Sequence, residues 1–326
     1  MRIALDAMGG DFAPHVVLEG GLLAAREYDI PLTLVGPRHV IEPFIAASGA
    51  QHGSLEVCHA PEVVTMDEHP SAAVRQKPLS SIAVGLDLVK NGQADAFVSA
   101  GNTGAVMASA LLRLGRLPGI ERPALGAMLP TTSGRCLLLD VGANADCKPG
   151  YLLQFAHMGV AYMRAMGISD PRVGLLNIGE EETKGNQLSQ EAHQLLAKSG
   201  LHFLGNVEGK DLTRGAADVV VTDGFTGNVI IKTAEGLGEM VVHQIREVLT
   251  SKLQYKLAAA LLLPAIKELA RRFDYSESGG VPLLGVNGVV VIGHGRSNAR
   301  AIQQAVLVAS RAVDGNVVQA ISNIAR

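Results

Sequence analysis

Short apolar runs alternate with polar, glycine-containing loops and helical segments along most of the chain. The plainest example is the run at 218–222, which enters the loop 223–228 and then a helical stretch from Val229 to Thr250. The run at 96–100 is followed in the same way by the loop 101–104. This alternation of strand and helix periodicity predicts an α/β fold with a mostly parallel sheet.

The same pattern recurs often enough to predict one continuous unit over residues 1–326, because no linker or low-complexity tract divides the chain. Ligands of such sheets bind beyond the carboxyl ends of the strands. We therefore expect the polar loops that follow the strands to face a single cleft. Further strands are predicted at 2–6, 31–35, 136–140, 173–177 and 288–292. Helices are predicted over about 13–28, from about residue 149 onward, in a segment that ends at 196, and from residue 299 onward.

Residues 229–275 break this rhythm, since they predict two long helices with no strand between them, a helical hairpin that projects from the sheet. Residues 251–273 carry five basic side chains and one acidic one around an apolar centre. This pattern indicates either a membrane-surface anchor or a dock for an acidic partner, whereas a helix buried in a dimer interface would be equally apolar. Pro264 favours the surface interpretation, because it would interrupt a long packed helix. The expected contact residues are Lys256, Leu261, Leu262, Leu263, Lys267, Arg271 and Arg272.

Composition narrows the class of protein. The chain has 326 residues, of which 48% are hydrophobic and 4% aromatic, as suits a buried parallel sheet covered by helices. A net charge of −3 argues against a general nucleic-acid binder. Three cysteines without a CxxC pair favour a reducing, cytoplasmic setting. The first residues lack the apolar stretch of a signal peptide, and no run is long enough to predict a membrane-spanning helix.

The polar loops point to an anionic ligand, because a helix N-terminus presents unpaired N–H groups and glycine lets an anion approach them. The loop 177–186 places Lys184 after three adjacent carboxylates, where it would bind an anion or a developing negative charge; a solvated charge cluster is the alternative. In the loop 223–228, Thr226 and Asn228 are candidates both for ligand contact and for capping the next helix. The expected phosphate or substrate contacts are Asp6, Gly9, Gly10, Ser99, Asn102, Thr103, Gly104, Asn144, Asn177, Asp223, Thr226, Gly227 and His294.

Other chemistries find less support. The segment 293–298 is a near miss to the dinucleotide pattern GxGxxG, and no acidic residue follows at the required distance. The metalloprotease, P-loop and serine-hydrolase motifs are absent from the sequence. Cys136 begins an apolar strand and is interpreted as inert core. No metal and no cofactor are predicted, although turn-forming aspartates could hold Mg²⁺ in principle: Asp6, Asp11, Asp140, Asp146 and Asp223.

Five motifs in order, at 1–11, 99–104, 140–144, 177–186 and 222–228, resemble those of the bacterial acyl-ACP:phosphate acyltransferases, the PlsX family of phospholipid synthesis. The resemblance covers nearly the whole chain. It implies a three-layer α/β/α fold similar to isocitrate dehydrogenase and phosphotransacetylase, with a mixed, mostly parallel sheet.

The resemblance also implies a reaction, in which inorganic phosphate attacks the thioester of long-chain acyl–acyl carrier protein (acyl-ACP) and yields acyl phosphate. The family's site residues carry over onto Lys184 and Asn228. The implied partners are acyl carrier protein, inorganic phosphate, a second copy of the chain, the inner-membrane surface, with peripheral binding through the hairpin, and the downstream glycerol-3-phosphate acyltransferase.

The candidate residues of the polar loops are compatible with this reaction. Phosphate is itself the nucleophile, so the protein needs only to position it and to stabilise the thioester oxyanion. Two alternatives stay open. One is a phosphotransacetylase that acts on short-chain acyl-CoA, and the other is a non-catalytic, membrane-associated scaffold. The apolar, basic hairpin argues against the first, and the several site-like loops argue against the second.

Overall fold

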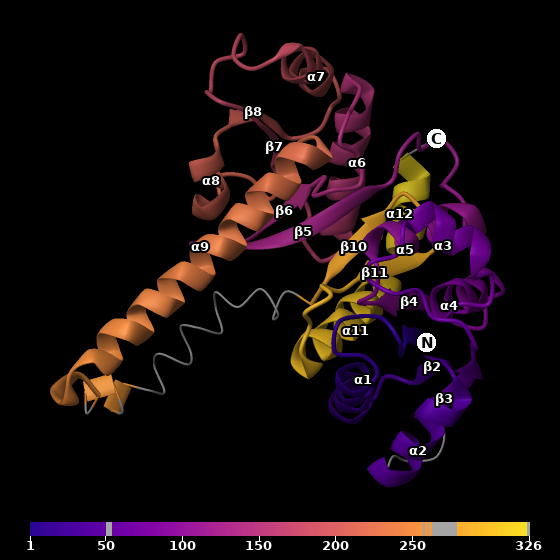
Figure 1. The fold of residues 1–326 in the computed structure, drawn as a ribbon. Helices are drawn as coiled ribbons and strands as arrows, with labels where there is room; N and C mark the ends of the chain where they lie inside the picture. The colour runs from indigo at the N-terminus through magenta and orange to yellow at the C-terminus, as the bar shows by residue number, and fades with distance from the viewer. Residues whose placement is uncertain (50–53, 257, 260, 263–278, 325–326) are drawn as a thin grey trace.

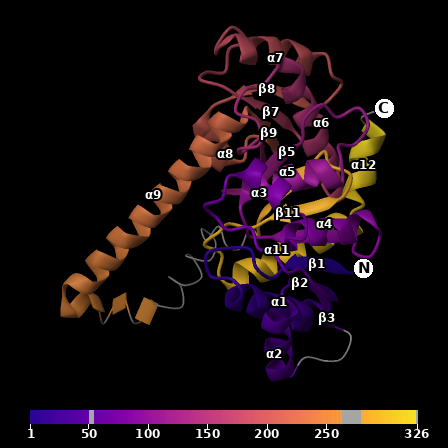
Figure 2. The same ribbon diagram turned by 45° about the vertical axis from the view of Figure 1, so that its right-hand side comes forward.

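The computed structural model describes residues 1–49, 54–256, 258–259, 261–262 and 279–324. Within these ranges the chain forms one eleven-stranded sheet with helices on both faces (Figures 1 and 2). Every predicted strand is present, and four further strands join them. The strands are β1 Ile3–Asp6, β2 Leu32–Gly36, β3 Leu55–His59, β4 Ala96–Ser99, β5 Ala124–Thr131, β6 Gly134–Leu139, β7 Val173–Leu176, β8 Phe203–Val207, β9 Val219–Val221, β10 Val281–Leu284 and β11 Val289–Ile292.

The sheet has two parallel parts that run in opposite directions. Its order is β3-β2-β1-β4-β11-β10-β5-β6-β9-β7-β8. Strands β1 to β4 and β11, here called the β1 half, are mutually parallel, and so are β6 to β9, here called the β6 half. Between them β10 pairs antiparallel with β11 and with β5, and β5 pairs antiparallel with β6.

The polar loops were expected to face a single cleft because parallel strands end at one edge of a sheet, and this premise does not hold here. Three antiparallel pairings in a row reverse the strand direction, so the carboxyl ends of the two halves point in opposite directions along the sheet. Each step between neighbouring strands also turns the strand direction by roughly 20–25°. Even so, Lys232, which follows β9, places its Nζ 3.3 Å from Nε2 of His294, which follows β11.

Helices cover both faces and confirm the three-layer α/β/α prediction. Successive strand residues point to opposite faces, so Ile3 and Leu5 join one hydrophobic cluster and Ala4 joins the other. The helices are α1 His15–Tyr28, α2 Arg38–Ser48, α3 Pro70–Gln76, α4 Ser81–Lys90, α5 Thr103–Arg113, α6 Pro149–Ala165, α7 Gln187–Ala197, α8 Gly209–Arg214, α9 Gly224–Ser251, α11 Ala299–Asp314 and α12 Val317–Ile324.

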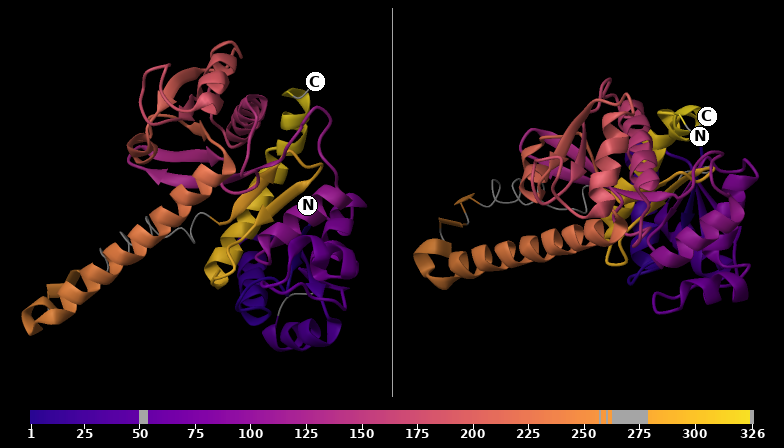
Figure 3. Two further views of the ribbon diagram at one scale, coloured as in Figure 1. Left: turned by 45° about the horizontal axis from the view of Figure 1, so that its top comes forward. Right: turned by 90° about the horizontal axis from the view of Figure 1, so that it is seen from above.

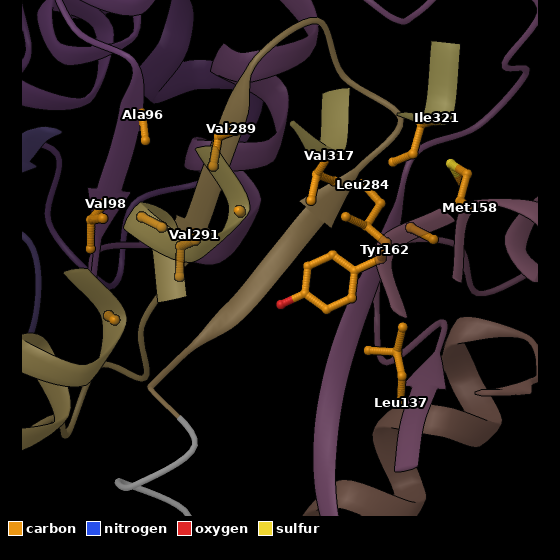
Figure 4. Close-up of a cluster of buried hydrophobic side chains, with 14 of the residues drawn as sticks. Ala96, Val98, Leu137, Met158, Tyr162, Leu284, Val289, Val291, Val317 and Ile321 are labelled. Carbon is orange, nitrogen blue, oxygen red and sulfur yellow. The ribbon is translucent and has the colours of Figure 1, made fainter. Parts of the chain in front are cut away.

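The core runs without interruption through the junction of the two halves. Figure 4 shows Leu284 of β10 next to Tyr162 of α6, with Val289 of β11 on the other side of the cluster. All three belong to the larger hydrophobic cluster. Burial raises the pKa of the Tyr162 phenol to about 12, which keeps it neutral.

Helix α9 projects from the body of the protein (Figures 1 and 3). It begins at Gly224, five residues before the predicted start, because Asp223 caps it. It covers the first predicted helix; most of the second lies outside the described residues, so the hairpin stays a prediction. Beyond α9, Lys256, Leu261 and Leu262 are exposed. The other predicted contact residues lie outside the described residues: Leu263, Lys267, Arg271 and Arg272.

Candidate active site

In the β1 half, a buried aspartate organises the loop that follows β1. The carboxylate of Asp6 accepts hydrogen bonds from the Ser99 hydroxyl at 2.7 Å and from the Met8 amide at 3.1 Å. The Ser99 oxygen in turn accepts from the Gly101 amide at 3.0 Å. Burial raises the pKa of Asp6, opposed by these bonds and by one from Ser81. Asp6 and Ser99 are fully buried, so they support the predicted phosphate-binding loops from inside the protein.

Close backbone packing completes this loop cluster. A methyl group on Gly9 would lie 2.6 Å from both the Asp6 carboxylate and the Gly101 nitrogen, so only glycine fits there. Gly10 has a φ of +114°, and the next amide, that of Asp11, donates to the Gly295 carbonyl at 2.8 Å. The loops after β1, β4 and β11 are thus packed against one another.

Asn102 links this cluster to the segment that precedes α3. Its Nδ2 donates to the carbonyls of Met66 at 3.1 Å and Glu68 at 2.9 Å, and its Oδ1 caps α5 by accepting from the Ala105 amide. Thr103, the next residue, is exposed. A methyl group on Gly104 would lie 2.5 Å from Pro70. Asn102 therefore positions the segment 62–69 beside the loops.

In the β6 half, Asp140 organises the loop after β6, as Asp6 organises the loop after β1 in the β1 half. Its buried carboxylate accepts five hydrogen bonds at 2.8–3.1 Å, from the amides of Leu125, Gly142, Ala143 and Asn144 and from Asn144 Nδ2. Burial raises the pKa of Asp140, and these hydrogen bonds oppose the rise. Asn144 is used within this network, where its Nδ2 also donates to the Pro123 carbonyl at 2.8 Å.

The start of α9 is packed directly onto this network. Asp223 caps the helix by accepting from the Thr226 amide and hydroxyl, both at 2.8 Å. The Gly224 amide donates to the Asn144 carbonyl at 2.7 Å. A methyl group on Gly227 would lie 1.8 Å from the Asp140 carbonyl oxygen, so the helix can reach the loop only with glycine at this position.

Asn228 and Lys184 are exposed at the surface of the β6 half. Asn228 lies over Gly142, where an added methyl group would be 3.7 Å from its Oδ1. Lys184 follows β7 in a loop that Asn177 braces, since Asn177 Nδ2 donates to the Lys184 carbonyl at 3.1 Å. In the described part of the chain no hydrogen bond joins Lys184 to Asn228, so their joint action stays a prediction.

One contact joins the two halves across these loops. Lys232, on α9, places its Nζ 3.3 Å from Nε2 of His294, in the loop after β11, and 2.8 Å from the Glu235 carboxylate. His294 was expected from the sequence but Lys232 was not, because a lysine inside an amphipathic helix has the pattern of an ordinary surface residue. Its spacing of four from Asn228, which puts both on one helix face, is the signal that could have found it.

Cys136 is buried within β6. Burial raises the pKa of Cys136 to about 12, consistent with its interpretation as inert core. Among the described residues, no group of three or more His, Cys, Asp or Glu side chains has an arrangement that could hold a metal ion.

The fold is that of the phosphotransacetylases. A phosphotransacetylase from Streptococcus pyogenes matches with a TM-score of 0.64 at 19% identity, over 98% of this chain and 94% of that one. This likeness concerns the fold alone.

The sequence comparisons define the family. A protein-family model, described as "Fatty acid synthesis protein", matches residues 1–320 of the chain. A phosphate acyltransferase from Heliobacterium modesticaldum is 51% identical over 323 residues, 98% of this chain and 96% of the relative. One from Myxococcus xanthus is 52% identical over 97% of this chain and 91% of the relative. The chain belongs to the phosphate acyltransferase family, an acyltransferase of fatty acid and phospholipid synthesis, as the resemblance predicted.

Proposed function

We propose that the protein transfers the acyl group of long-chain acyl-ACP to inorganic phosphate. The observation that carries the proposal is the position of Asn228, whose amide is exposed on the first turns of α9, over Gly142, on the helix face from which Lys232 reaches the loop of the β1 half. Phosphate and thioester could meet there between two sets of loops that the buried aspartates keep in place.

The proposed step needs few groups. A phosphate oxygen attacks the thioester carbonyl carbon and forms the new C–O bond, while the carbonyl electron pair moves onto oxygen. Collapse of this tetrahedral oxyanion breaks the C–S bond, and the thiolate leaves and takes a proton from solvent. The products are acyl phosphate and free carrier protein. The protein's contribution is to position the reactants and to stabilise the oxyanion.

Lys184 and Asn228 are the residues we assign to this task. The Lys184 ammonium forms no ion pair within the described ranges and is held by the loop that Asn177 braces, so it is available to an anion. The Asn228 amide can donate to the developing oxyanion. Loss of one such donor lowers kcat by about 10²–10³-fold in well-studied enzymes.

Phosphate-dependent release of free thiol from palmitoyl-ACP tests the proposal. Lys184→Ala and Asn228→Ala should keep the wild-type melting temperature and lose most of this activity, while Lys90→Ala, an exposed lysine on α4, should keep it. Unchanged turnover in both site variants would remove them from the site. A chain-length series on acyl-ACP and acyl-CoA separates the proposed enzyme from a short-chain phosphotransacetylase. If no acyl thioester is turned over, the scaffold alternative stands.

We also propose that the protein binds the cytoplasmic face of the inner membrane peripherally, through the segment beyond α9. Leu261 is 84% exposed and Leu262 is 55% exposed, close to the basic Lys256. No helix in the described residues is both long and apolar enough to cross a bilayer. The same basic segment could instead dock the acidic carrier protein.

Flotation with phosphatidylglycerol vesicles tests the membrane contact. The double variant Leu261→Glu/Leu262→Glu should stay in the unbound fraction, whereas Leu112→Glu, a similarly exposed leucine on α5, should float with the vesicles. Equal flotation of all three proteins would contradict the anchor.

A homodimer is the remaining part of the proposal. Four apolar side chains of α9 recur at helical spacing and are 46–58% exposed, and they offer a surface for a second copy: Leu237, Val241, Ile245 and Val248. A monomer mass in sedimentation velocity at micromolar concentration would contradict it.

A further inference from the structure

The loop that carries Lys184 has few backbone hydrogen bonds of its own. Between Ile178 and Asn186, all of which the structure describes, one backbone–backbone bond forms within the loop, from the Lys184 amide to the Glu181 carbonyl at 3.0 Å. A single turn does not hold such a loop in one conformation, because every ordered residue loses conformational entropy. The position of Lys184 therefore depends on groups outside the loop.

Three side-chain amides from separate parts of the chain supply these groups. Asn206, on β8, donates from Nδ2 to the Glu181 carbonyl at 2.8 Å. Asn177, which follows β7, donates to the Lys184 carbonyl at 3.1 Å. Gln190, on α7, donates at 2.8 Å to the carbonyl of the residue before Lys184. Side chains thus hold the backbone on both sides of the turn and at Lys184 itself.

The turn also places the first part of the Lys184 side chain. A methyl group on Gly179 would lie 3.1 Å from Lys184 Cγ and 3.0 Å from the Glu181 carboxylate, so both side chains lie over this glycine. Lys184 as a whole stays exposed. A change in the turn at Glu181 would therefore move the ammonium group as well as the backbone.

Asn206 differs from the other two amides in its burial. The residue is 6% exposed, and its Oδ1 is the one buried side-chain polar atom of the described ranges that has no hydrogen-bond partner. The Glu181 carbonyl that its Nδ2 reaches already accepts from the Lys184 amide. An apolar residue of similar shape would avoid the unsatisfied oxygen and would not leave that carbonyl unpaired. Stability alone therefore does not explain an amide at this position.

We propose that Asn206 is a positioning residue for the reaction. From its buried place on β8 it fixes the turn at residues 181–184, and through this turn it fixes the position of the Lys184 ammonium group. The inference rests on the proposed function, in which Lys184 acts on an anion of the reaction. Asn206 touches no reactant, because its side chain is buried under the loop.

Steady-state kinetics of phosphate-dependent thiol release from palmitoyl-ACP tests the inference. Asn206→Leu keeps a branched side chain and removes both the donor and the unsatisfied acceptor, so it should melt near the wild-type temperature. Its kcat/KM should fall by about 10- to 100-fold, as expected when a catalytic group is displaced. The parameter that changes should be the one that Lys184→Ala changes: kcat if Lys184 acts on the oxyanion, or the KM for phosphate if it binds phosphate.

A double-mutant cycle shows whether Asn206 acts through Lys184. In the Lys184→Ala background, Asn206→Leu should lower kcat/KM by less than about twofold, since no ammonium group is left to position. Gln154→Leu is the matched control, because the Gln154 amide also braces a loop, donating to the Gly119 carbonyl at 2.9 Å, but in a loop without a proposed site residue. This variant should keep the wild-type kcat and KM values.

Hydrogen exchange provides a readout besides turnover. In Asn206→Leu the peptide that contains Lys184 should exchange its amide protons faster than in the wild type, while the peptides of α4 and α6 should keep their rates. Asn206→Ala, which adds no volume, should give the same result. Because the exchange rates do not depend on substrate, they report on the loop even if the reaction is a different one.

Several results would overturn the inference and leave the proposed function intact. These are wild-type kinetics in both Asn206 variants, wild-type exchange rates in the loop, or a loss that multiplies fully with that of Lys184→Ala. Failure of both Asn206 variants to fold would assign the residue to the fold alone and would also overturn it. Absence of phosphate-dependent thiol release in the wild-type protein would instead refute the proposed function.

Discussion

Both halves of the sheet hold a glycine-containing loop with a buried aspartate, but the hydrogen-bond donors to the two aspartates differ. Each ends a central strand in a buried aspartate that holds a glycine-containing loop. Asp6 is held partly by serine hydroxyls, whereas Asp140 is held entirely by N–H groups. A hydroxyl can donate or accept, but an N–H group can only donate. The two halves share a sequence pattern of a strand, an aspartate and a glycine. The two aspartates, here called the anchors, should nevertheless differ in how much a substitution destabilises the protein.

The largest expected effect concerns the glycines that pack on each anchor. Gly227→Ala should destabilise the protein by more than about 3 kcal/mol. Its methyl group would lie 1.8 Å from the Asp140 carbonyl oxygen, a backbone atom that cannot relieve the clash by changing rotamer as a side chain can. Gly9→Ala, with its closest contacts at 2.6 Å, should cost less. Urea unfolding measures both.

Gly236→Ala is the matched control on α9. The added methyl group meets nothing within 4 Å, so the change should stabilise by about 0.4–1 kcal/mol. Equal losses for Gly227→Ala and Gly9→Ala would mean that both anchors are packed with the same rigidity.

The second prediction exchanges each carboxylate for an amide. In Asp140→Asn the new NH₂ group must face N–H donors, which should cost about 1–3 kcal/mol for each buried group left unsatisfied. In Asp6→Asn the amide can donate to the Ser99 hydroxyl, so the loss should be smaller. Chemical unfolding of the two variants at pH 7 gives the order. If Asp6→Asn proves the more damaging, the hydroxyls do not adapt and the comparison fails.

The smallest expected effect is a pH dependence confined to the β1 half, where Lys77 pairs with Glu68 at 2.6 Å. Hydrogen bonds from Lys77 and Thr65 lower the pKa of Glu68 to about 2 from 4.5. The pair therefore contributes stability that is complete above pH 4.5 and is lost as the pH falls toward 2.

Melting curves of wild type and Glu68→Gln between pH 7 and pH 3 test this effect. The wild type should melt higher near neutral pH, and the gap should narrow below pH 4.5. A gap that stays constant over the range would show that the Glu68 charge has no part in holding the segment.

Much of the fold could be predicted, because strands of branched apolar residues followed by polar loops have a clear pattern. The prediction failed where the sheet reverses. Strand β5 contains Gly126 and Pro130, and β10 contains Pro282. Both residue types are uncommon in strands. If these two strands are not recognised, the two parallel halves are assigned one common direction, and this assignment is the part of the prediction that is wrong.

The candidate site was predictable as a set of loops, but the sequence did not separate supports from contacts. Residues such as Asp6, Asn102 and Asn144 have the composition of ligand-binding residues, and the structure shows that their polar atoms are used within the protein. Lys184 and Asn228 are exposed instead. Burial and hydrogen-bond partners are tertiary properties, which a motif does not contain.

The position of β11 also has a consequence for the order in which the protein is made. Strand β11 lies between β4 and β10 in the sheet, although residues 289–292 are synthesised long after β4. Helix α11 packs so closely on α1 that a methyl group on Gly20 would lie 2.5 Å from the Ala299 carbonyl oxygen. On the ribosome, β4 therefore keeps an open edge until β11 emerges, whereas β6 to β9 are made one after another. The β6 half can assemble first, and the nascent β1 half must be kept from pairing with other chains while it waits.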